Sequence, residues 1–553
     1  MKKVLIWMLT LMLGNVCKAE DITISFDGST AKVEQTKKDS VKVTVKGAQV
    51  NIESTYTSHH LSLRLKGKSD DGQLVLKTAG KAKVKLDGLS LTSQEGAPLT
   101  LKNKKKVEIV AAKGTVNTLT ITACNDTANN KAAVIWAKDK VLLSGKGTLN
   151  VVATGDGCRG IKTKDDITIE ELTLNVTTTG DNLGEKPFDF GGIPGFSDGE
   201  MPDFSGFPPF GNDSTGIRFP GFGGGHFPGF PNDSTGHHRP DFSHFPGFGG
   251  GHFPGFSNDS IARGNFPNFG GGFPPFGNDS TARGNFPNFG NFPGFGDQTP
   301  PLSEGDWGEA GFGMGGFGGK HKYIASTKGI ASKGKIIINS GNVAVRTTTA
   351  GAEGIEGKEG IVFNGGKVDV SSTDDAINAN ATIEFNGADV LAYSSGNDAV
   401  DSNPAGGFFG FFGGNNNQDT IPAIIVRGGS VYAWSQVGSP EEGLDCDFAP
   451  LVVEGGTVFT VGGGMGEMPS VPSNENAKQP TVLLIGLSVV KDQPIVISDA
   501  KGKQVDTVTV PFNLRRSASL VTSPAFKLGN TYTVKTQNYE RTFTLTESFT
   551  TIR

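Results

Sequence analysis

Four short acidic frames in the second half of the chain carry the side chains best suited to chemistry. Each frame has an acid, a small residue, an aliphatic residue and a second acid or amide: Glu353-Gly-Ile-Glu356, Asp375-Ala-Ile-Asn378, Asp398-Ala-Val-Asp401 and Glu442-Gly-Leu-Asp445. Asp374 and Asp447 lie beside two of these frames. Carboxylate and amide oxygens without paired His or Cys are ligands for hard cations, so the set favours Ca²⁺ over zinc or copper.

The frames recur with the period of a β-solenoid coil. Their small residue stands at Gly329, Gly354, Ala376 and Ala399, at intervals of 22 to 25 residues, and again at Gly443 after a Gly/Phe/Asn run at 406–420. Short aliphatic-x-aliphatic strands separated by a glycine turn follow each one, as in IVFNGGKVDV at 361–370. The pattern predicts an all-β chain whose parallel strands bury their aliphatic side chains by stacking coil on coil.

Equal positions in neighbouring coils of such a solenoid lie about 4.8 Å apart. We therefore expect two columns, one of Glu353, Asp375, Asp398 and Glu442, the other of Glu356, Asn378, Asp401 and Asp445. Adjacent carboxylates would repel by about 3 kcal/mol at an effective dielectric constant of about 20, so the columns need cations or raised pKa values. The alternative is that these acids are exposed turn residues pointing into water.

The same frame is basic in the two preceding coils, which read Arg159-Gly-Ile-Lys162 and Lys328-Gly-Ile-Ala331. Arg159, Lys162 and Lys328 beside bound Ca²⁺ would suit a polyanion, so we predict an acidic polysaccharide as the partner. The formal net charge of -5 and the pI near 6.0 argue against a nucleic-acid partner.

Residues 1–19 are predicted to be a signal peptide, with a basic start at Lys2 and Lys3, an apolar run at 4–13 and a small-residue cleavage site at Ala19. The mature chain would then be secreted, periplasmic or at the cell surface. Lipidation of Cys17 is the alternative, although Gly14-Asn15-Val16 is a poor lipobox. No later apolar run approaches the ~18 residues of a membrane span.

Composition divides the mature chain. Residues 20–186 and 321–477 are predicted to be the two parts of the solenoid, 187–320 a flexible insertion, and 478–553 a terminal β unit. Glycine and proline are so dense in the insertion that a packed core could not offset its ordering entropy. Its four Asn-Asp-Ser repeats resemble the O-glycosylation signal of some Gram-negative anaerobes, which predicts modification at Ser214, Ser234, Ser260 and Ser280; duplication of a neutral motif is the alternative.

The repeated frames, VKLDGLSLTS at 84–93 and LVVEGGTVFTVGGGMGEMP at 451–469 resemble a family of secreted bacterial carbohydrate-binding β-helix proteins. The resemblance covers nearly the whole mature chain outside the insertion. It implies a right-handed parallel β-helix similar to that of pectate lyases, Ca²⁺ binding by the acidic frames, and binding of a polygalacturonate-like polysaccharide. Because Arg159 and Lys328 replace acids, metal sites in their coils are doubtful.

A calcium-dependent, non-catalytic binding protein is the leading hypothesis. A polysaccharide lyase is the enzymatic alternative, since Ca²⁺ acidifies the proton beside a uronate carboxylate and Arg159, Lys162, Lys328 or Arg346 could act as the base. A third hypothesis is a glycosylated surface or adhesion protein with structural calcium. The sequence gives no oligomeric state.

Overall fold

The computed structural model describes residues 21–36, 40–58, 60–123, 132–185, 323–404, 421–446, 449–464 and 469–553. The chain divides into two units, one of residues 1–185 with 307–553 and one of residues 186–306, and every described residue belongs to the first. The described part of this first unit contains forty β-strands and no helix, and hence no helix that could cross a membrane.

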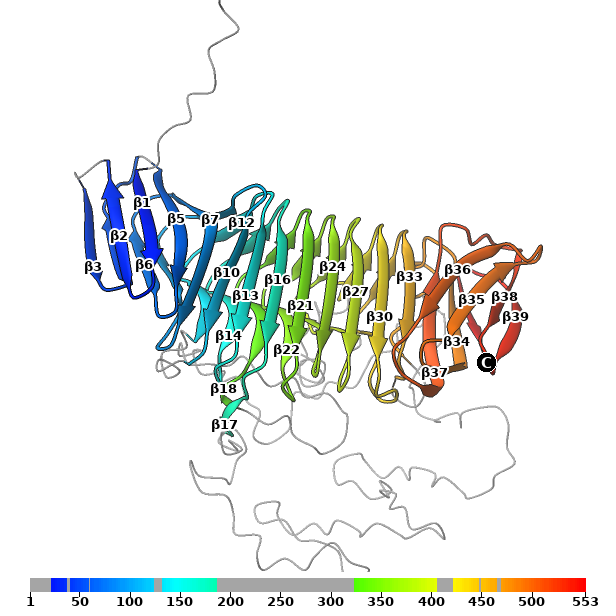
Figure 1. The fold of residues 1–553 in the computed structure, drawn as a ribbon. Coiled ribbons are helices and arrows are strands. Elements are labelled where there is room, and N and C mark those ends of the chain that lie inside the picture. The colour runs from blue at the N-terminus through cyan, green and yellow to red at the C-terminus, as the bar shows by residue number, and fades with distance from the viewer. Residues whose placement is uncertain are drawn as a thin grey trace, which may run out of the picture. The chain divides into compact units, whose positions relative to one another are not determined.

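The repeated coils each supply one strand to three parallel ladders, here called faces 1, 2 and 3 (Figure 1). Face 1 contains β11 (Ala133–Ala137), β14 (Arg159–Thr163), β19 (Lys328–Ser332), β22 (Glu353–Gly357), β25 (Ile377–Ala379), β28 (Val400–Ser402) and β31 (Leu444–Asp445). Face 2 contains β12 (Val141–Ser144), β15 (Ile167–Ile169), β20 (Ile336–Ile338), β23 (Ile361–Phe363), β26 (Ile383–Phe385), β29 (Ile424–Val426) and β32 (Leu451–Val453). Face 3 contains β13 (Thr148–Ala153), β16 (Thr173–Thr178), β21 (Asn342–Thr347), β24 (Lys367–Ser372), β27 (Asp389–Ser394), β30 (Ser430–Ser435) and β33 (Thr457–Val461).

The faces continue to the N-terminus through longer strands. Face 1 continues through β8 (Leu99–Asn103), β6 (Gln73–Thr78), β4 (Gln49–Ser54) and β3 (Val41–Lys46). Faces 2 and 3 merge through β9 (Val107–Ala111), β10 (Val116–Ile121), β7 (Ala82–Ser93), β5 (Leu61–Ser69), β1 (Ile22–Asp27) and β2 (Thr30–Gln35). The pairs β1–β2 and β3–β4 are antiparallel, whereas β1–β5 and β4–β6 are already parallel. Parallel stacking therefore begins with the first strands of the described chain.

A terminal set of strands follows β33. It contains β34 (Thr481–Val489), β35 (Pro494–Asp499), β36 (Gln504–Thr509), β37 (Leu514–Thr522), β38 (Thr531–Lys535), β39 (Glu540–Thr544) and β40 (Phe549–Ile552). β37 pairs antiparallel with both β33 and β34, and β36-β35-β38-β39 form a separate antiparallel sheet. A short antiparallel pair, β17 (Leu183–Glu185) and β18 (Tyr323–Ala325), brackets residues 186–322.

The all-β, parallel-strand architecture confirms the solenoid-like fold expected from the repeats. Its interior is a continuous stack of aliphatic side chains, with Phe363 lying flat on Phe385 one coil later at a ring-centroid distance of 5.0 Å. The small residue of each frame has a steric reason. A Cβ on Gly329 or Gly354 would lie 2.3 Å from a valine methyl of face 3 in the same coil, so these positions need glycine.

Cys158 and Cys446 are buried; Cys124 lies outside the described residues.

Candidate functional site

The acidic frames form the two predicted columns on face 1. The register pairs Ile355 with Ile377, Ile377 with Val400 and Val400 with Leu444, so the acids before these residues stack as expected. In the second column, Glu356 pairs with Asn378, Asn378 with Asp401, and Asp401 with Asp445. Asp447 and the four predicted glycosylation serines lie outside the described residues.

The columns are buried, so the interpretation of these acids as exposed turn residues is wrong. Buried members of the two columns are Glu356, Asp375, Asn378, Asp398, Asp401 and Glu442. Glu353, Asp374 and Asp445 are half-buried. Buried carboxylates need partners, which the structure supplies differently along the axis.

At the N-terminal end of the columns, lysines neutralise the acids. Lys328, only 2% exposed, places Nζ 3.2 Å from Glu353 Oε2 and 2.8 Å from Glu356 Oε1. Lys358 Nζ lies 2.5 Å from the same Glu356 oxygen. Two lysines and two glutamates therefore form a compact cluster, here called the lysine–glutamate cluster.

The two glutamates of this cluster have opposite pKa shifts. Burial raises the pKa of Glu353 to about 8, with Lys328 opposing the shift and Glu356, Asp374 and Asp375 adding to it. The ammonium groups of Lys328 and Lys358 outweigh burial at Glu356 and lower its pKa. At neutral pH the contact of Lys328 with Glu353 is thus a hydrogen bond to a protonated acid, and the charge pairing is with Glu356.

In the middle of the columns, amides take the place of lysines. Asn378 Nδ2 donates to Asp375 Oδ2 at 2.8 Å and to Asp401 Oδ2 at 3.1 Å. Asn403 Nδ2 donates to both Asp401 oxygens, and Asn397 Nδ2 donates to Asp374 Oδ1 at 2.8 Å. These bonds engage one oxygen each of Asp374 and Asp375 and both oxygens of Asp401.

At the C-terminal end, carboxylates crowd around Asp398. Burial raises the pKa of the Asp398 carboxyl well above its usual value. The negative charges of nearby acids raise this pKa further, in the order Asp445, Asp375, Asp401 and Glu441. The all-oxygen donor chemistry here suits Ca²⁺. However, within the described ranges no three His, Cys, Asp or Glu side chains converge closely enough to hold a metal ion together. The residues as placed do not form a ready coordination shell.

The predicted basic ligand-binding residues are directed to the protein itself. Arg159 is buried and donates through Nε to the Ser326 carbonyl and through a terminal nitrogen to Ser326 Oγ, both at 2.9 Å. Lys162 is also buried, and Lys328 belongs to the lysine–glutamate cluster. In this conformation none of the three presents its charge to a polysaccharide, contrary to the expectation from their position in the frame.

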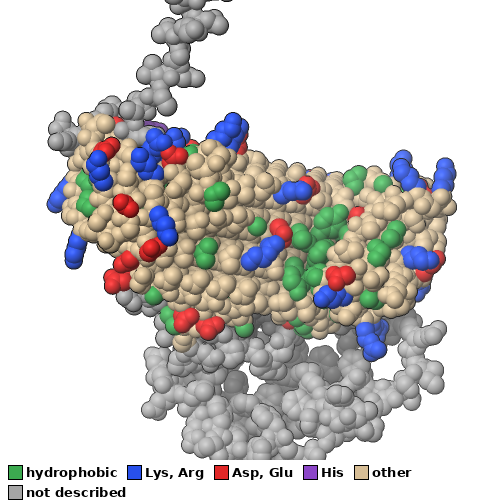
Figure 2. Space-filling model, in the orientation of Figure 1, with side chains coloured by type: hydrophobic (Ala, Val, Ile, Leu, Met, Phe, Trp, Pro, Cys, Tyr) green, Lys and Arg blue, Asp and Glu red, His purple; other side chains and the backbone are tan. Residues whose placement is uncertain are grey.

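An open groove lies on face 3. This groove, of about 540 Å³, runs along the solenoid axis across β16, β21, β24, β27 and β30. Its outward side chains are Asn175, Asn342, Ala344, Lys367, Asp369, Asp389, Leu391, Ser430 and Tyr432. Figure 2 shows hydrophobic side chains gathered at its end over the last coils, beside charged groups.

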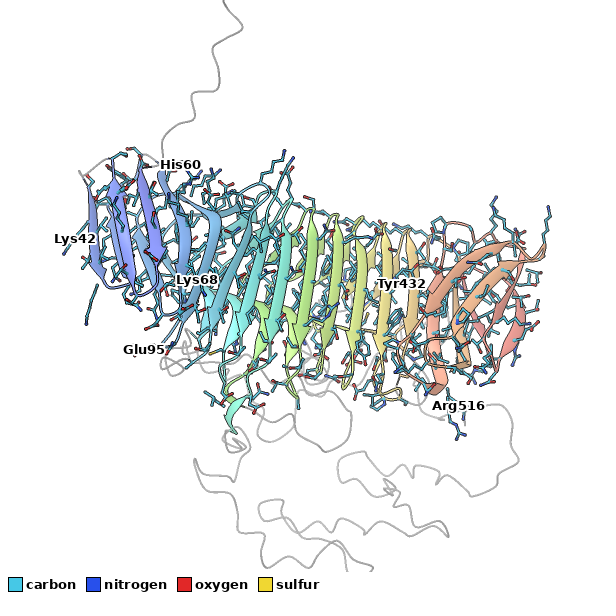
Figure 3. All side chains as sticks on the ribbon, in the orientation of Figure 1. Lys42, His60, Lys68, Glu95, Tyr432 and Arg516 are labelled. Atoms are coloured by element: carbon cyan, nitrogen blue, oxygen red, sulfur yellow. The ribbon has the colours of Figure 1, made fainter. Side chains whose placement is uncertain are left out.

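The terminal strands contact the groove residue Tyr432 at this end. Tyr432, on the outward side of β30 (Figure 3), directs its hydroxyl to Asp506 Oδ1 of β36 at 3.5 Å. Burial and, to a smaller extent, the nearby carboxylate of Asp506 raise the pKa of Tyr432 to about 12, so the phenol keeps its proton. Tyr393 of β27 stacks on Phe512 with ring centroids 5.9 Å apart.

Sequence reasoning missed the groove because it followed the frames of face 1. The available signal was the alternation of the face-3 strands, whose outward positions hold Asn175, Ala344, Asp369, Leu391 and Tyr432 in one register column. Arg346, one of the predicted lyase bases, lies beside this column and pairs with Asp369 at 2.6 Å.

Two comparisons with known sequences found similarity to proteins described as carbohydrate-binding. The sequence profile of a family described as carbohydrate-binding domain-containing protein matches residues 46–187 and 317–399. A carbohydrate-binding domain-containing protein of Acetivibrio thermocellus is 29% identical over 159 residues, which are 28% of this chain and 52% of the relative. The chain thus spans about half the length of that relative.

Among solved structures, the chain is similar to a polysaccharide lyase-like protein from C. thermocellum, determined as a gadolinium derivative. The identity is 17%, the TM-score is 0.35, and the likeness covers 69% of this chain and 92% of that one.

Proposed function

We propose that this protein is a non-catalytic polysaccharide-binding protein that holds a glycan chain in the face-3 groove, parallel to the solenoid axis. The groove itself is the observation that carries the proposal. Asn175, Asn342 and Ser430 offer hydrogen-bonding groups along it, and Leu391 with Tyr432 forms an apolar floor at the end that lies on β27 and β30. A sugar ring has both an apolar face and hydroxyl groups, so it suits this combination.

The proposed glycan is acidic. Lys367 is exposed in the groove and is the direct register partner of Asp389 on the next coil. Its ammonium would pair with a uronate carboxylate, and the neighbouring Asp369 and Asp389 would accept hydrogen bonds from hydroxyl groups.

Binding of the chain to polygalacturonate and to a neutral glycan tests the groove. A Leu391→Ala, Tyr432→Ala double variant removes the apolar floor, and we expect it to lose about 2 kcal/mol of binding free energy, roughly 30-fold in affinity. Val116→Ala is the control, because Val116 is 62% exposed on β10, outside the groove. Unchanged affinity of the double variant would exclude the groove as the binding site.

A lyase is the second candidate because Arg346 stands beside the groove. Its side chain and that of Asp369 are 41% and 47% exposed. A base must be deprotonated to accept a proton, whereas an arginine guanidinium keeps its charge in proteins. We therefore expect no new absorbance from unsaturated uronides when the protein is incubated with polygalacturonate; its appearance, and its loss in Arg346→Lys, would make the protein a lyase.

We propose calcium binding only at the Asp398 end of the columns. Carboxylates predominate at this end, whereas lysines and amides contact the acids in the middle and at the N-terminal end of the columns. Movement of these side chains toward one another would be needed. Adding Ca²⁺ should raise the melting temperature of the wild type but not of an Asp398→Asn, Asp401→Asn variant. An equal response of both proteins, or none, would refute calcium binding at this place.

A further inference from the structure

A row of lysines follows the edge where face 1 turns into face 2. One lysine stands at the end of the face-1 strand in each of six successive coils: Lys77, Lys102, Lys138, Lys164, Lys333 and Lys358, here called the lysine row. Lys77 pairs directly with Lys102. Backbone N–H groups of Lys138, Lys164, Lys333 and Lys358 donate to Leu101, Ala137, Thr163 and Ser332, which places each lysine beside the one before.

Most of the row faces solvent. All its members except the half-buried Lys358 are exposed. Lys77 Nζ lies 3.7 Å from Glu53, and Lys358 contacts Glu356 and Asn380. The four central members, Lys102, Lys138, Lys164 and Lys333, form no ion pair with any carboxylate in the described parts of the chain.

A second basic line runs beside the row. Lys81, Lys106 and Lys140 precede the paired residues Ala82, Val107 and Val141, so they are neighbours across three coils. The next position of this line, one coil after Lys140, is the acid Asp166, whose carboxylate lies 2.6 Å from Lys140 Nζ. A chain whose formal net charge is -5 therefore concentrates positive charge on one edge.

We propose that the lysine row binds a linear anionic polysaccharide of the polyuronate type, laid along the solenoid axis. This goes beyond the groove, which lies on another face, and rests on the proposed function in taking a polysaccharide as the ligand. Successive coils place one charge about every 4.8 Å, and five steps span about 24 Å. A polymer with one carboxylate per sugar can pair with several of these point charges at once, and flexible lysine side chains tolerate imperfect spacing.

The composition of the turns favours a polysaccharide over single-stranded nucleic acid. The turn residues 104–106, 138–140, 164–166, 333–335 and 358–360 include no aromatic side chain on which bases could stack.

The test compares the full chain with two charge-matched variants. The row variant changes four lysines of the row to Gln: Lys102, Lys138, Lys164 and Lys333. The control variant changes four exposed lysines elsewhere to Gln: Lys42, Lys491, Lys501 and Lys503. Lys42 lies near the N-terminal end of the described chain (Figure 3). Binding to polygalacturonate, its methyl-esterified form and single-stranded DNA is measured at low and high salt, with unfolding midpoints to verify folding. We expect at least about tenfold weaker polygalacturonate binding for the row variant at low salt, a smaller difference at high salt, and a change below about twofold for the control.

Each of the other possible outcomes contradicts a different part of the proposal. Equal polygalacturonate binding by the row and control variants excludes the row but leaves the groove. Wild-type binding of the esterified glycan alone also excludes the row. If DNA binds more tightly than polygalacturonate and this binding depends on the row, the ligand of the row is a nucleic acid and not a polyuronate. If the protein binds no glycan, both the lysine row as a glycan site and the proposed function are excluded.

Discussion

Lys328 holds the lysine–glutamate cluster together, because its buried ammonium lies between Glu353 and Glu356. In Lys328→Met the glutamates lose this cation while remaining within the fold, and we expect the free energy of unfolding to fall by about 3–5 kcal/mol in denaturant titration. Adding Glu353→Gln and Glu356→Gln to that variant should restore most of the loss. If the triple variant is no more stable than Lys328→Met, the lost stability comes from packing and not from charge.

Glu353 should make stability depend on pH. Its pKa rises from an ordinary 4.5 to about 8 in the fold, so between these values the folded state binds more protons than the unfolded state. The contribution of this group is therefore fully present below about pH 4.5 and is lost as the pH rises toward 8. The pKa of Glu356 is lowered, so this residue is ionised in both states across that window and adds no slope there.

The measurement is the melting temperature of wild type and Glu353→Gln from pH 5 to 8. Glutamine imitates the protonated acid, so the advantage of the variant should grow with pH. A constant difference across the range would show that Glu353 titrates normally.

At the scale of the strand and its turn, the frame glycines set how closely face 1 approaches face 3. A Cβ on Gly354 would lie 2.3 Å from Val370 Cγ1 and 2.5 Å from the Ala376 carbonyl oxygen, whereas one on Gly96 would meet only a flexible side chain at 3.6 Å. Gly354→Ala should therefore cost about 1–3 kcal/mol of unfolding free energy, and Gly96→Ala almost none. Similar losses in both would mean that backbone freedom, not contact with Val370, determines the choice of glycine.

The same elements show how far sequence reasoning reaches. The small-aliphatic spacing predicts the coils and the columns, because stacked coils leave the phase of each frame no freedom. Burial of Asp375 and Lys328 could not be predicted, since it depends on what surrounds the face. The pairing of Lys328 with Glu353 was within reach, because both occupy the same column one coil apart. The contact of Tyr432 with Asp506 could not be predicted, because the fold-back of the terminal strands onto β30 and β33 has no repeat signal.

At the scale of the whole described unit, the solenoid and the terminal strands share one core at their junction. Phe459 of β33 is fully buried among side chains that include Val482, Leu484 and Val521 of β34 and β37. Because contacts in a solenoid are mainly between neighbouring coils, the loss of stability caused by a substitution at this junction should remain local. Phe459→Ala should cost about 3–5 kcal/mol and lower hydrogen-exchange protection in β34–β37, while leaving β5–β14 unchanged.

Phe363→Ala is the matched control, since Phe363 is also fully buried but stacks on Phe385 in the solenoid interior. Its loss of protection should centre on β20–β26. Uniform loss in both variants would show that the described unit unfolds as a single cooperative body. The junction also connects stability to function, because the core that contains Phe459 also contains Val508 of β36, the strand whose Asp506 contacts the groove residue Tyr432. Phe459→Ala should therefore weaken glycan binding, whereas Phe363→Ala should leave it unchanged under conditions where the variant remains folded.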